Sequence, residues 1–482
     1  MSLTETYEAV LAAWTEGRLE NVLQRQKEIA RLHAALKQAR SQLIAAFAAD
    51  FDVPEASAVE EIECALDGVQ QLYDQLDFPS ALAKERSIQA GRSAPSNSVA
   101  LGPLLIQAAL PCPISSVILP LTAAVAAGSC CLVHLCIEAP EVSRLLYAII
   151  RDSLDYEAVG LVNQPLSSTD FGVLHFESAV LQDSATGSEL ATVLRKTNPM
   201  ARIHTPAPGL PAIFIDRSTP ALEMAANWVR DSILNAPVQH SGRMPRLCFV
   251  DESILQQFHA ILKRHMDTSG EAGAHLLETP TTKEIASSLK ALFPSLQKKM
   301  SSSRPDQLPR LVVLQSTDPT NPETIGQVAK LLTQSYQGVL LIPTRSLDQG
   351  IDLWNTVNTG MSATATYLFG QKKETWYLAQ FLKSEHCFIN CIPPRSFAMI
   401  APSSAHDTFT LPYRPEDFST NKAILQDSHS TSRRDWLDLK RLAQPAGHQL
   451  SYFEQGLIVG LSVTALAASG LVFAIFKLFR GS

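Results

Sequence analysis

The sequence predicts an α/β protein built on parallel β-sheets, and two observations lead to this prediction. Short, uninterrupted apolar runs, such as residues 104–106 and 131–133, are typical of strands that are buried on both faces. Stretches with apolar residues at helical spacing alternate with these runs, which is the pattern of βαβ units. The length of 482 residues predicts two or three domains, and an apolar content of 46% is enough for large cores.

The N-terminal region is predicted to be helical. Apolar residues recur at helical spacing between positions 29 and 47, and basic residues lie between them. A second helical stretch runs from about residue 58 to residue 76. The apolar positions of the first stretch are Ile29, Leu32, Leu36, Leu43 and Phe47.

Strands and helices then alternate with short links, which predicts a nucleotide-binding half of the Rossmann type. A strand at 104–106 is followed by a helix at 114–127, a strand at 131–133 and a helix from about 138 to 154. Further strands are predicted downstream, mostly alternating with helices. They lie at residues 212–215, 247–250, 311–314, 339–342 and 367–369.

An uncharged run of 21 residues, 456–476, lies close to the C-terminus and is bounded by Glu454, Lys477 and Arg480. As a helix rising about 1.5 Å per residue it would span a hydrocarbon core of roughly 30 Å. We therefore expect a C-terminal transmembrane helix, with the body on the cytosolic side as in a tail-anchored protein. The alternative is a buried or dimer-packing helix. Gly456 and Gly460 form a small-x-x-x-small pair that would suit a second helix.

Composition restricts the classes of partner and compartment. The eight cysteines lack paired spacing, which favours a reducing compartment and buried thiols such as Cys130 and Cys131 over a disulfide framework or a zinc site. The N-terminus has no basic and apolar signal sequence. The net charge is −7 and no long basic block occurs, so nucleic acid is not an expected partner.

The ordered landmarks of the chain resemble those of the aldehyde dehydrogenase superfamily. The segment ALGPLLIQAALPCPISSVILPLTAAVAAGSCCLVHLCIEAPEVS has the family's frame of a Gly-Pro-flanked strand, a Pro-Leu helix, an Ala-Ala-Gly turn and a strand ending in Glu-Ala-Pro. Residues 211–216, 235–236, 338–342 and 407–409 match later landmarks. The layout, with its terminal apolar helix, resembles the fatty aldehyde dehydrogenases of the class-3 type. The resemblance implies an aldehyde dehydrogenase-like fold with a Rossmann-type cofactor domain and an α/β catalytic-type domain.

The catalytic positions implied by this resemblance do not carry the family's chemistry. The family's asparagine, which stabilises the oxyanion, falls at Pro111. The glutamate that acts as the family's general base falls in the segment around Pro206. An alignment without gaps places the family's cysteine nucleophile at His240. An alignment that also matches the following strand places it at Gly242, beside Ser241. The nearest cysteine, Cys248, lies in a predicted buried strand, where a core thiol is the expected role. These substitutions together are typical of a catalytically degenerate protein.

The cofactor positions implied by the resemblance are also altered. His134 replaces the lysine that contacts the adenosine ribose, and Gln334 replaces a second ribose contact. A Thr-Gly-Ser turn for phosphate survives as Thr186, Gly187 and Ser188, at the predicted start of a helix. The expected cofactor is therefore none, or NAD(P) bound weakly.

Two functions of different class follow. The first is a membrane-anchored, aldehyde dehydrogenase-like protein that has lost catalysis and binds a partner or a small apolar metabolite. The second is an active NAD(P)-dependent aldehyde oxidoreductase with non-standard residues, such as His240 or Ser241. A homodimer or a pair with an active relative is expected, and the endoplasmic reticulum is favoured over the mitochondrial or peroxisomal outer surface.

The predicted domain boundaries follow from the same resemblance and from the C-terminal run. A cofactor-type domain with the N-terminal helices is expected at 1–207 and a catalytic-type domain at 208–400. An oligomerisation arm at 401–415, a linker at 416–455 and the transmembrane helix at 456–476 complete the chain.

Overall fold

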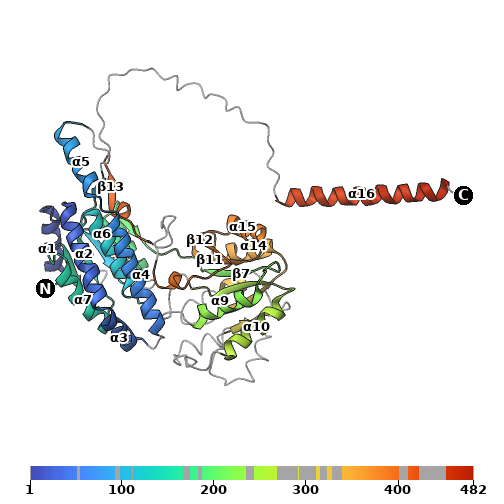
Figure 1. The fold of residues 1–482 in the computed structure, drawn as a ribbon, viewed down its shortest axis with the longest axis horizontal. Helices are drawn as coiled ribbons and strands as arrows, with labels where there is room; N and C mark the ends of the chain where they lie inside the picture. The colour runs from blue at the N-terminus through green and yellow to red at the C-terminus, as the bar shows by residue number, and fades with distance from the viewer. Residues whose placement is uncertain are drawn as a thin grey trace, which may run out of the picture. The chain divides into compact units, whose positions relative to one another are not determined.

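The computed structural model confirms an α/β protein with parallel sheets (Figure 1). It forms two units, Met1–Ile424 and Leu425–Ser482. The structure describes residues 2–51, 55–92, 98–110, 112–166, 174–182, 187–234, 244–268, 291–292, 311–314, 323–327, 339–400, 411–422 and 452–480.

The first sheet has five parallel strands in the order β4-β3-β2-β5-β6. The apolar residues of β2, β3 and β5 are buried, as expected for strands covered on both faces, whereas Leu161 of β4 and Ile203 of β6 are partly buried. The strands are β2 (Leu104–Gln107), β3 (Cys131–His134), β4 (Val159–Val162), β5 (Ser178–Leu181) and β6 (Arg202–His204).

Most of the helices from the N-terminal part of the chain pack on this sheet in two hydrophobic clusters, whereas α5 buries none of its residues. Helix α6 is buried along almost its whole length and ends at Gly128, whose φ of 99° is the left-handed conformation that glycine adopts without strain. The helices are α1 (Leu3–Thr15), α2 (Val22–Gln38), α3 (Arg40–Asp50), α4 (Glu55–Asp74), α5 (Phe78–Gln89), α6 (Ser115–Ala127), α7 (Pro140–Ser153) and α8 (Gly187–Thr197).

The second sheet has six parallel strands in the order β12-β11-β7-β8-β10-β9. One hydrophobic cluster lies between the sheet and helices α14 and α15, and another lies between it and helices α9 and α10. The two helix pairs cover opposite faces of the sheet (Figure 1). The elements are β7 (Ala212–Ile215), α9 (Leu222–Leu234), β8 (Leu247–Asp251), α10 (Leu255–Thr268), β9 (Leu311–Val313), β10 (Val339–Thr344), α14 (Leu347–Val357), β11 (Ala363–Phe369), α15 (Lys372–Phe381) and β12 (Ser384–Ile389).

Two predictions for the body are corrected by the structure. The helical stretch from 29 to 47 is divided at Ala39 into α2 and α3, because Ala39 leaves the helical conformation with a ψ of 1°. The predicted linker begins later than residue 416, because η3 (Pro415–Phe418) buries Phe418 in the core beside α6. Strand β13 (Ser419–Asn421) then pairs antiparallel with β1 (Ser98–Ala100).

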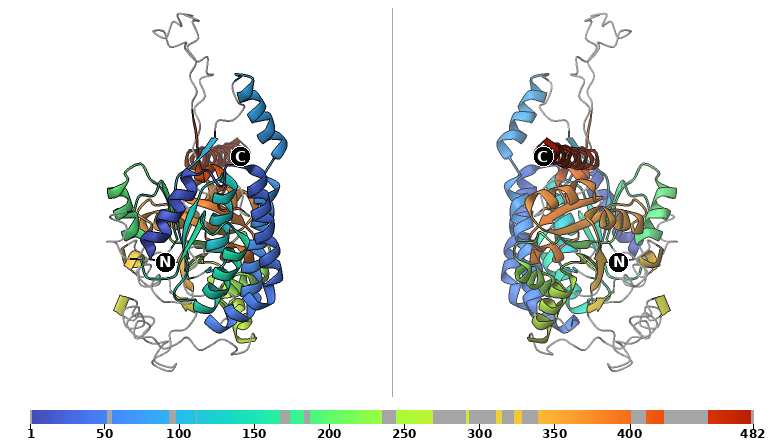
Figure 2. Two further views of the ribbon diagram at one scale, coloured as in Figure 1. Left: turned by 90° about the vertical axis from the view of Figure 1, so that its left-hand side faces the viewer. Right: turned by 90° about the vertical axis from the view of Figure 1, so that its right-hand side faces the viewer.

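The predicted oligomerisation arm lies mostly outside the described residues. Its residues 401–410 are not described, and Leu411 and Tyr413 beyond them are buried in the first core. Helix η2 (Pro394–Phe397) precedes this segment and packs beside α4. The two views of Figure 2 show the N-terminal helices and the second sheet from opposite sides.

The described part of the C-terminal unit, residues 452–480, is the helix α16 (Tyr452–Arg480), of 29 residues. Among the helices in the described part of the chain, none combines the length and the apolarity needed to cross a membrane. The predicted C-terminal helix is thus present, and its transmembrane character is not confirmed.

Candidate functional site

The order of strands in the first sheet defines where a ligand would lie. Strands β2, β3 and β4 follow one another to one side, whereas β5 and β6 lie on the other side of β2. In open parallel sheets of this kind, ligands bind outside the carboxyl ends of the strands at such a reversal. The candidate site is therefore the crevice beyond Gln107 at the end of β2 and Leu181 at the end of β5.

The side chain of Gln182 spans this crevice. Its amide Nε2 donates to the carbonyl oxygen of Ser116 at 2.6 Å and to that of Gln107 at 3.3 Å. Gln182 is only 4% exposed, and Ser116 lies in the first turn of α6. The end of β5 is thus tied to the start of α6 across the place where the sheet order reverses.

The start of α6 is occupied by a carboxyl group. Glu61 reaches from α4, and its Oε1 accepts the backbone N–H groups of Ile114 at 2.7 Å and Ser115 at 2.9 Å. These amides are among those that a helix N-terminus offers to an anion. Glu61 is 1% exposed, and burial raises its pKa to about 8, while the two amide hydrogen bonds act in the opposite direction. This anion-binding position is therefore filled by the protein itself.

A short segment near residue 400 closes over the loop that follows β2. The carbonyl oxygen of Phe397 accepts from the Cys112 thiol at 3.2 Å, and that of Ala398 accepts from the Ser115 hydroxyl at 2.7 Å. Arg395 of the same segment forms ion pairs with Asp67 and Glu60 of α4. We call residues 393–400 the strap. Helix α4 thus binds both the strap and, through Glu61, the start of α6.

Two of the predicted cofactor positions lie at this edge of the sheet. His134 ends β3, is 8% exposed and places Nε2 3.0 Å from the carbonyl oxygen of Gln164. Gly187 and Ser188 open α8 as predicted, with Gly187 buried and Ser188 exposed. Thr186 and Gln334, the other predicted cofactor contacts, lie outside the described residues.

The predicted catalytic positions are described only in part. Pro111, His240, Ser241 and Gly242 lie outside the described residues. Pro206 is half-buried in the connection between β6 and β7.

The cysteine nearest the predicted nucleophile loop is confirmed as a core residue. Cys248 is fully buried in β8, and burial raises the pKa of its thiol well above the usual range. A thiol in this position cannot meet a substrate without unfolding the strand. All eight cysteines are free, which confirms the prediction of thiols without disulfides.

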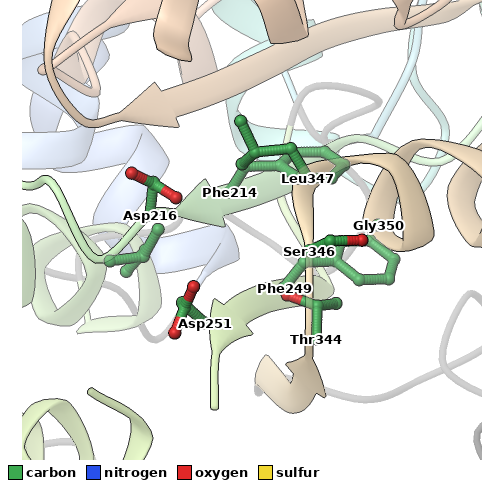
Figure 3. Close-up of a pocket in the computed structure, with 9 residues that line it drawn as sticks. Phe214, Asp216, Phe249, Asp251, Thr344, Ser346, Leu347 and Gly350 are labelled. Carbon is green, nitrogen blue, oxygen red and sulfur yellow. The ribbon is translucent and has the colours of Figure 1, made fainter. Parts of the chain in front are cut away.

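A second feature lies at the carboxyl ends of β7, β8 and β10, where Figure 3 shows Asp216, Asp251 and Thr344 around a small cavity. Its volume of about 10 Å³ has room for roughly one water molecule. The carboxylates bind their own turns, because Asp216 accepts the N–H of Ser218 and Asp251 accepts the N–H of Ser253, both at 2.9 Å. The cavity is thus too small for a substrate.

Sequence reasoning missed Glu61, Gln182 and Arg395. Glu61 offered a signal, because it lies on the apolar stripe of α4 that includes Ile62 and Ala65, and a carboxyl in such a stripe needs a buried partner. The sequence around Gln182 and Arg395 contains no comparable signal, because the residues that they contact are distant in the sequence.

Comparisons with known proteins agree with this architecture. No protein-family model matches the chain, and no curated protein is similar to it in sequence. Solved structures do match. The substrate-bound AldH of Staphylococcus aureus has a TM-score of 0.66 at 16% identity, over 89% of this chain and 95% of that one. The NAD-dependent benzaldehyde dehydrogenase of Corynebacterium glutamicum has a TM-score of 0.63 at 13% identity, over 86% and 88%.

A third solved structure is glyceraldehyde-3-phosphate dehydrogenase GapN of Methanocaldococcus jannaschii, in complex with NADP. It has a TM-score of 0.62 at 14% identity, over 87% of this chain and 92% of that one. Identities this low establish the fold and not the activity. The chain therefore has the fold of the aldehyde dehydrogenases.

The described residues do not fit a pyrophosphate at the start of α6. A pyrophosphate there would need free backbone amides, and those of Ile114 and Ser115 are bonded to Glu61. The Gln182 side chain also lies across the entrance between β2 and β5. The start of α8, at Gly187 and Ser188, is the remaining position of this edge, within the described residues, where a phosphate group could meet a helix N-terminus.

Proposed function

We propose that this chain is an aldehyde dehydrogenase-fold protein that acts by binding, and not by oxidising aldehydes. The observation that carries the proposal is the hydrogen bonding where the first sheet reverses, since Glu61 binds the backbone amides at the start of α6 and Gln182 ties the end of β5 to the same helix. The sequence supports it independently, since Pro111 and the loop with His240, Ser241 and Gly242 offer neither an oxyanion amide nor a thiol. The bound species is a protein partner, either a second copy or an active relative, or a small apolar metabolite.

Calorimetric titration of the full chain in detergent with NAD and with NADP tests this proposal. We expect no heat and no shift of the melting temperature, because ligand that binds only the folded state would raise that temperature. A Gln182→Ala variant distinguishes a dinucleotide site that is blocked by this side chain from a site that has been lost. Dinucleotide binding that appears only in the variant would show that Gln182 alone excludes the dinucleotide. Micromolar binding to the unmodified chain would contradict the proposal.

The second candidate is an active NAD(P)-dependent aldehyde oxidoreductase with non-standard residues. The structural similarity to dehydrogenases, one of them solved with NADP, favours it. It requires aldehyde-dependent formation of NADH or NADPH that is lost in His240→Ala or Ser241→Ala. We expect none of the long-chain aldehydes to give a stoichiometric burst.

We also propose that α16 attaches the protein to a membrane, with the body in the cytosol. The support is the sequence, in which residues 456–476 carry no charge. The endoplasmic reticulum remains the favoured membrane. The test is flotation of the full chain with phosphatidylcholine vesicles at high salt, beside a chain that ends at residue 451. Equal flotation of both chains, or of neither, would refute attachment by α16.

A further inference from the structure

Helix α15 exposes aromatic side chains that the fold does not use. Its inner side buries Thr375 and Leu378 against the second sheet. On its outer side Trp376 is 61% exposed and Phe381 is 47% exposed. Trp376 is the exposed tryptophan of the described chain, since the other described tryptophans are buried or half-buried. Exposed aromatic groups of this size on one helix point to an interaction surface.

Lysines accompany these aromatic residues. Lys372 and Lys373 in the first turn and Lys383 beyond the last turn are all exposed. At about 100° per residue, Lys372 and Lys373 lie roughly 40° and 60° to either side of Trp376 around the helix axis. Tyr377 and Phe381 continue on the side of Lys373, roughly 100° and 140° from Trp376, so these residues cover about half of the helix circumference. We call the residues Lys372, Lys373, Trp376, Tyr377, Phe381 and Lys383 the α15 face.

The aromatic part of the α15 face is ordered. The rings of Tyr377 and Phe381 pack with centroids 4.8 Å apart. The Tyr377 hydroxyl donates to Asp348 of α14 at 2.5 Å, so this neighbouring carboxylate is already hydrogen-bonded within the protein. The lysines thus flank a fixed aromatic surface, and α14 and α15 lie together on one side of the sheet (Figure 1).

We propose that the α15 face rests on a membrane surface that contains anionic lipids. Aromatic rings with one apolar and one polar side partition into the headgroup region, and lysines near the surface add an attraction to anionic headgroups. A protein partner fits this composition less well, because lysine is depleted in protein–protein interfaces. The inference rests on the proposed membrane attachment, and it adds a second contact that orients the body.

The experiment uses the full chain in vesicles of phosphatidylcholine, with or without about 30% phosphatidylserine, and lipids brominated near the headgroup. The difference between the fluorescence of the unmodified chain and that of Trp376→Phe isolates the signal of Trp376. We expect this signal to be blue-shifted and quenched only when phosphatidylserine is present, and to be restored by 0.5 M salt.

Replacing Lys372, Lys373 and Lys383 by Gln should weaken the contact by about 100-fold, since each lysine near an anionic surface contributes roughly a factor of five. Tyr156→Ala, which removes a side chain that is 69% exposed elsewhere, should leave the quenching unchanged. If the chain does not float with vesicles, membrane attachment by α16 has failed, and quenching by added vesicles still tests the α15 face separately.

A Trp376 signal that is the same with and without phosphatidylserine would overturn the proposal. A sedimentation coefficient that falls in Trp376→Ala/Phe381→Ala, without any lipid effect, would overturn it as well and would assign the face to a second copy of the chain.

Discussion

Replacing Glu61 by Gln should make the protein more stable at alkaline pH and leave it nearly unchanged at acidic pH. The carboxyl of Glu61 is 1% exposed, and burial raises its pKa from 4.5 to about 8. The folded state therefore keeps a proton that the unfolded chain releases above its own pKa. The stability that this group contributes is fully present below about pH 4.5 and is lost as the pH rises toward 8.

The magnitude follows from the shift. A difference of roughly 3.5 pH units, at 1.36 kcal/mol for each unit, corresponds to about 5 kcal/mol of lost stability at high pH. This figure is an upper bound, because the positive end of the α6 dipole favours the ionised carboxylate. The Gln side chain can still accept the two amides of Ile114 and Ser115, and it does not titrate.

Denaturant unfolding of both proteins at pH 5 and pH 8.5 measures the effect. We expect the stability of Glu61→Gln relative to the unmodified protein to rise by several kcal/mol between the two pH values. Glu63→Gln, which removes an exposed carboxylate of the same helix paired with Arg40, is the matched control and should show little change. A relative stability of Glu61→Gln that stays constant or falls with pH would refute the reasoning, and would mean that Glu61 is ionised in the folded state.

Three further predictions follow from single contacts. Gly209→Ala should lower the free energy of unfolding by about 1–3 kcal/mol, because an added Cβ would lie 2.6 Å from the carbonyl oxygen of Ser362, and equal stability would show that the backbone can move aside. Arg395→Ala should increase hydrogen exchange of the strap. It should change the melting temperature by no more than a few degrees, because the ion pairs of Arg395 are partly exposed. Unchanged hydrogen exchange would show that these ion pairs do not hold the strap in place. In the native protein, thiol labelling should reach the half-buried Cys387 and Cys391 within minutes and the buried thiols only after unfolding; rapid labelling of six or more cysteines would contradict the described burial.

The sequence predicts the buried elements of the fold well, because a strand covered on both faces leaves a continuous apolar run. Strand β7 is found at the predicted residues 212–215, and β8 differs by one residue at its end. The first half of β11 is not predicted, because it consists of small and hydroxyl-bearing residues, such as Thr366. Thr366 is nevertheless buried, and its hydroxyl group is hydrogen-bonded to that of Ser384 at 2.8 Å. Strand β12, which includes Ser384, is half-exposed at the edge of the sheet, and its first half, Ser384-Glu385-His386, is polar.

The candidate site is predicted less well than the fold, and the reason is physical. Burial can be inferred from the pattern along the chain, whereas a site depends on partners that the fold brings together from far apart. Gln182 and Ser116 are 66 residues apart, and Glu61 and Ile114 are 53 apart. His134, in contrast, falls at a strand end by resemblance to the aldehyde dehydrogenase landmarks, and it ends β3 in the structure.

These contacts also bear on how a fold can persist when its chemistry changes. At 11–16% identity, similar solved structures share the fold with this chain. A crevice at the reversal of a parallel sheet leaves backbone amides and carbonyls without partners, and buried groups of this kind are costly when unpaired. Here Glu61 and Gln182 supply partners for such groups, and their hydrogen bonds therefore stabilise the fold at this reversal.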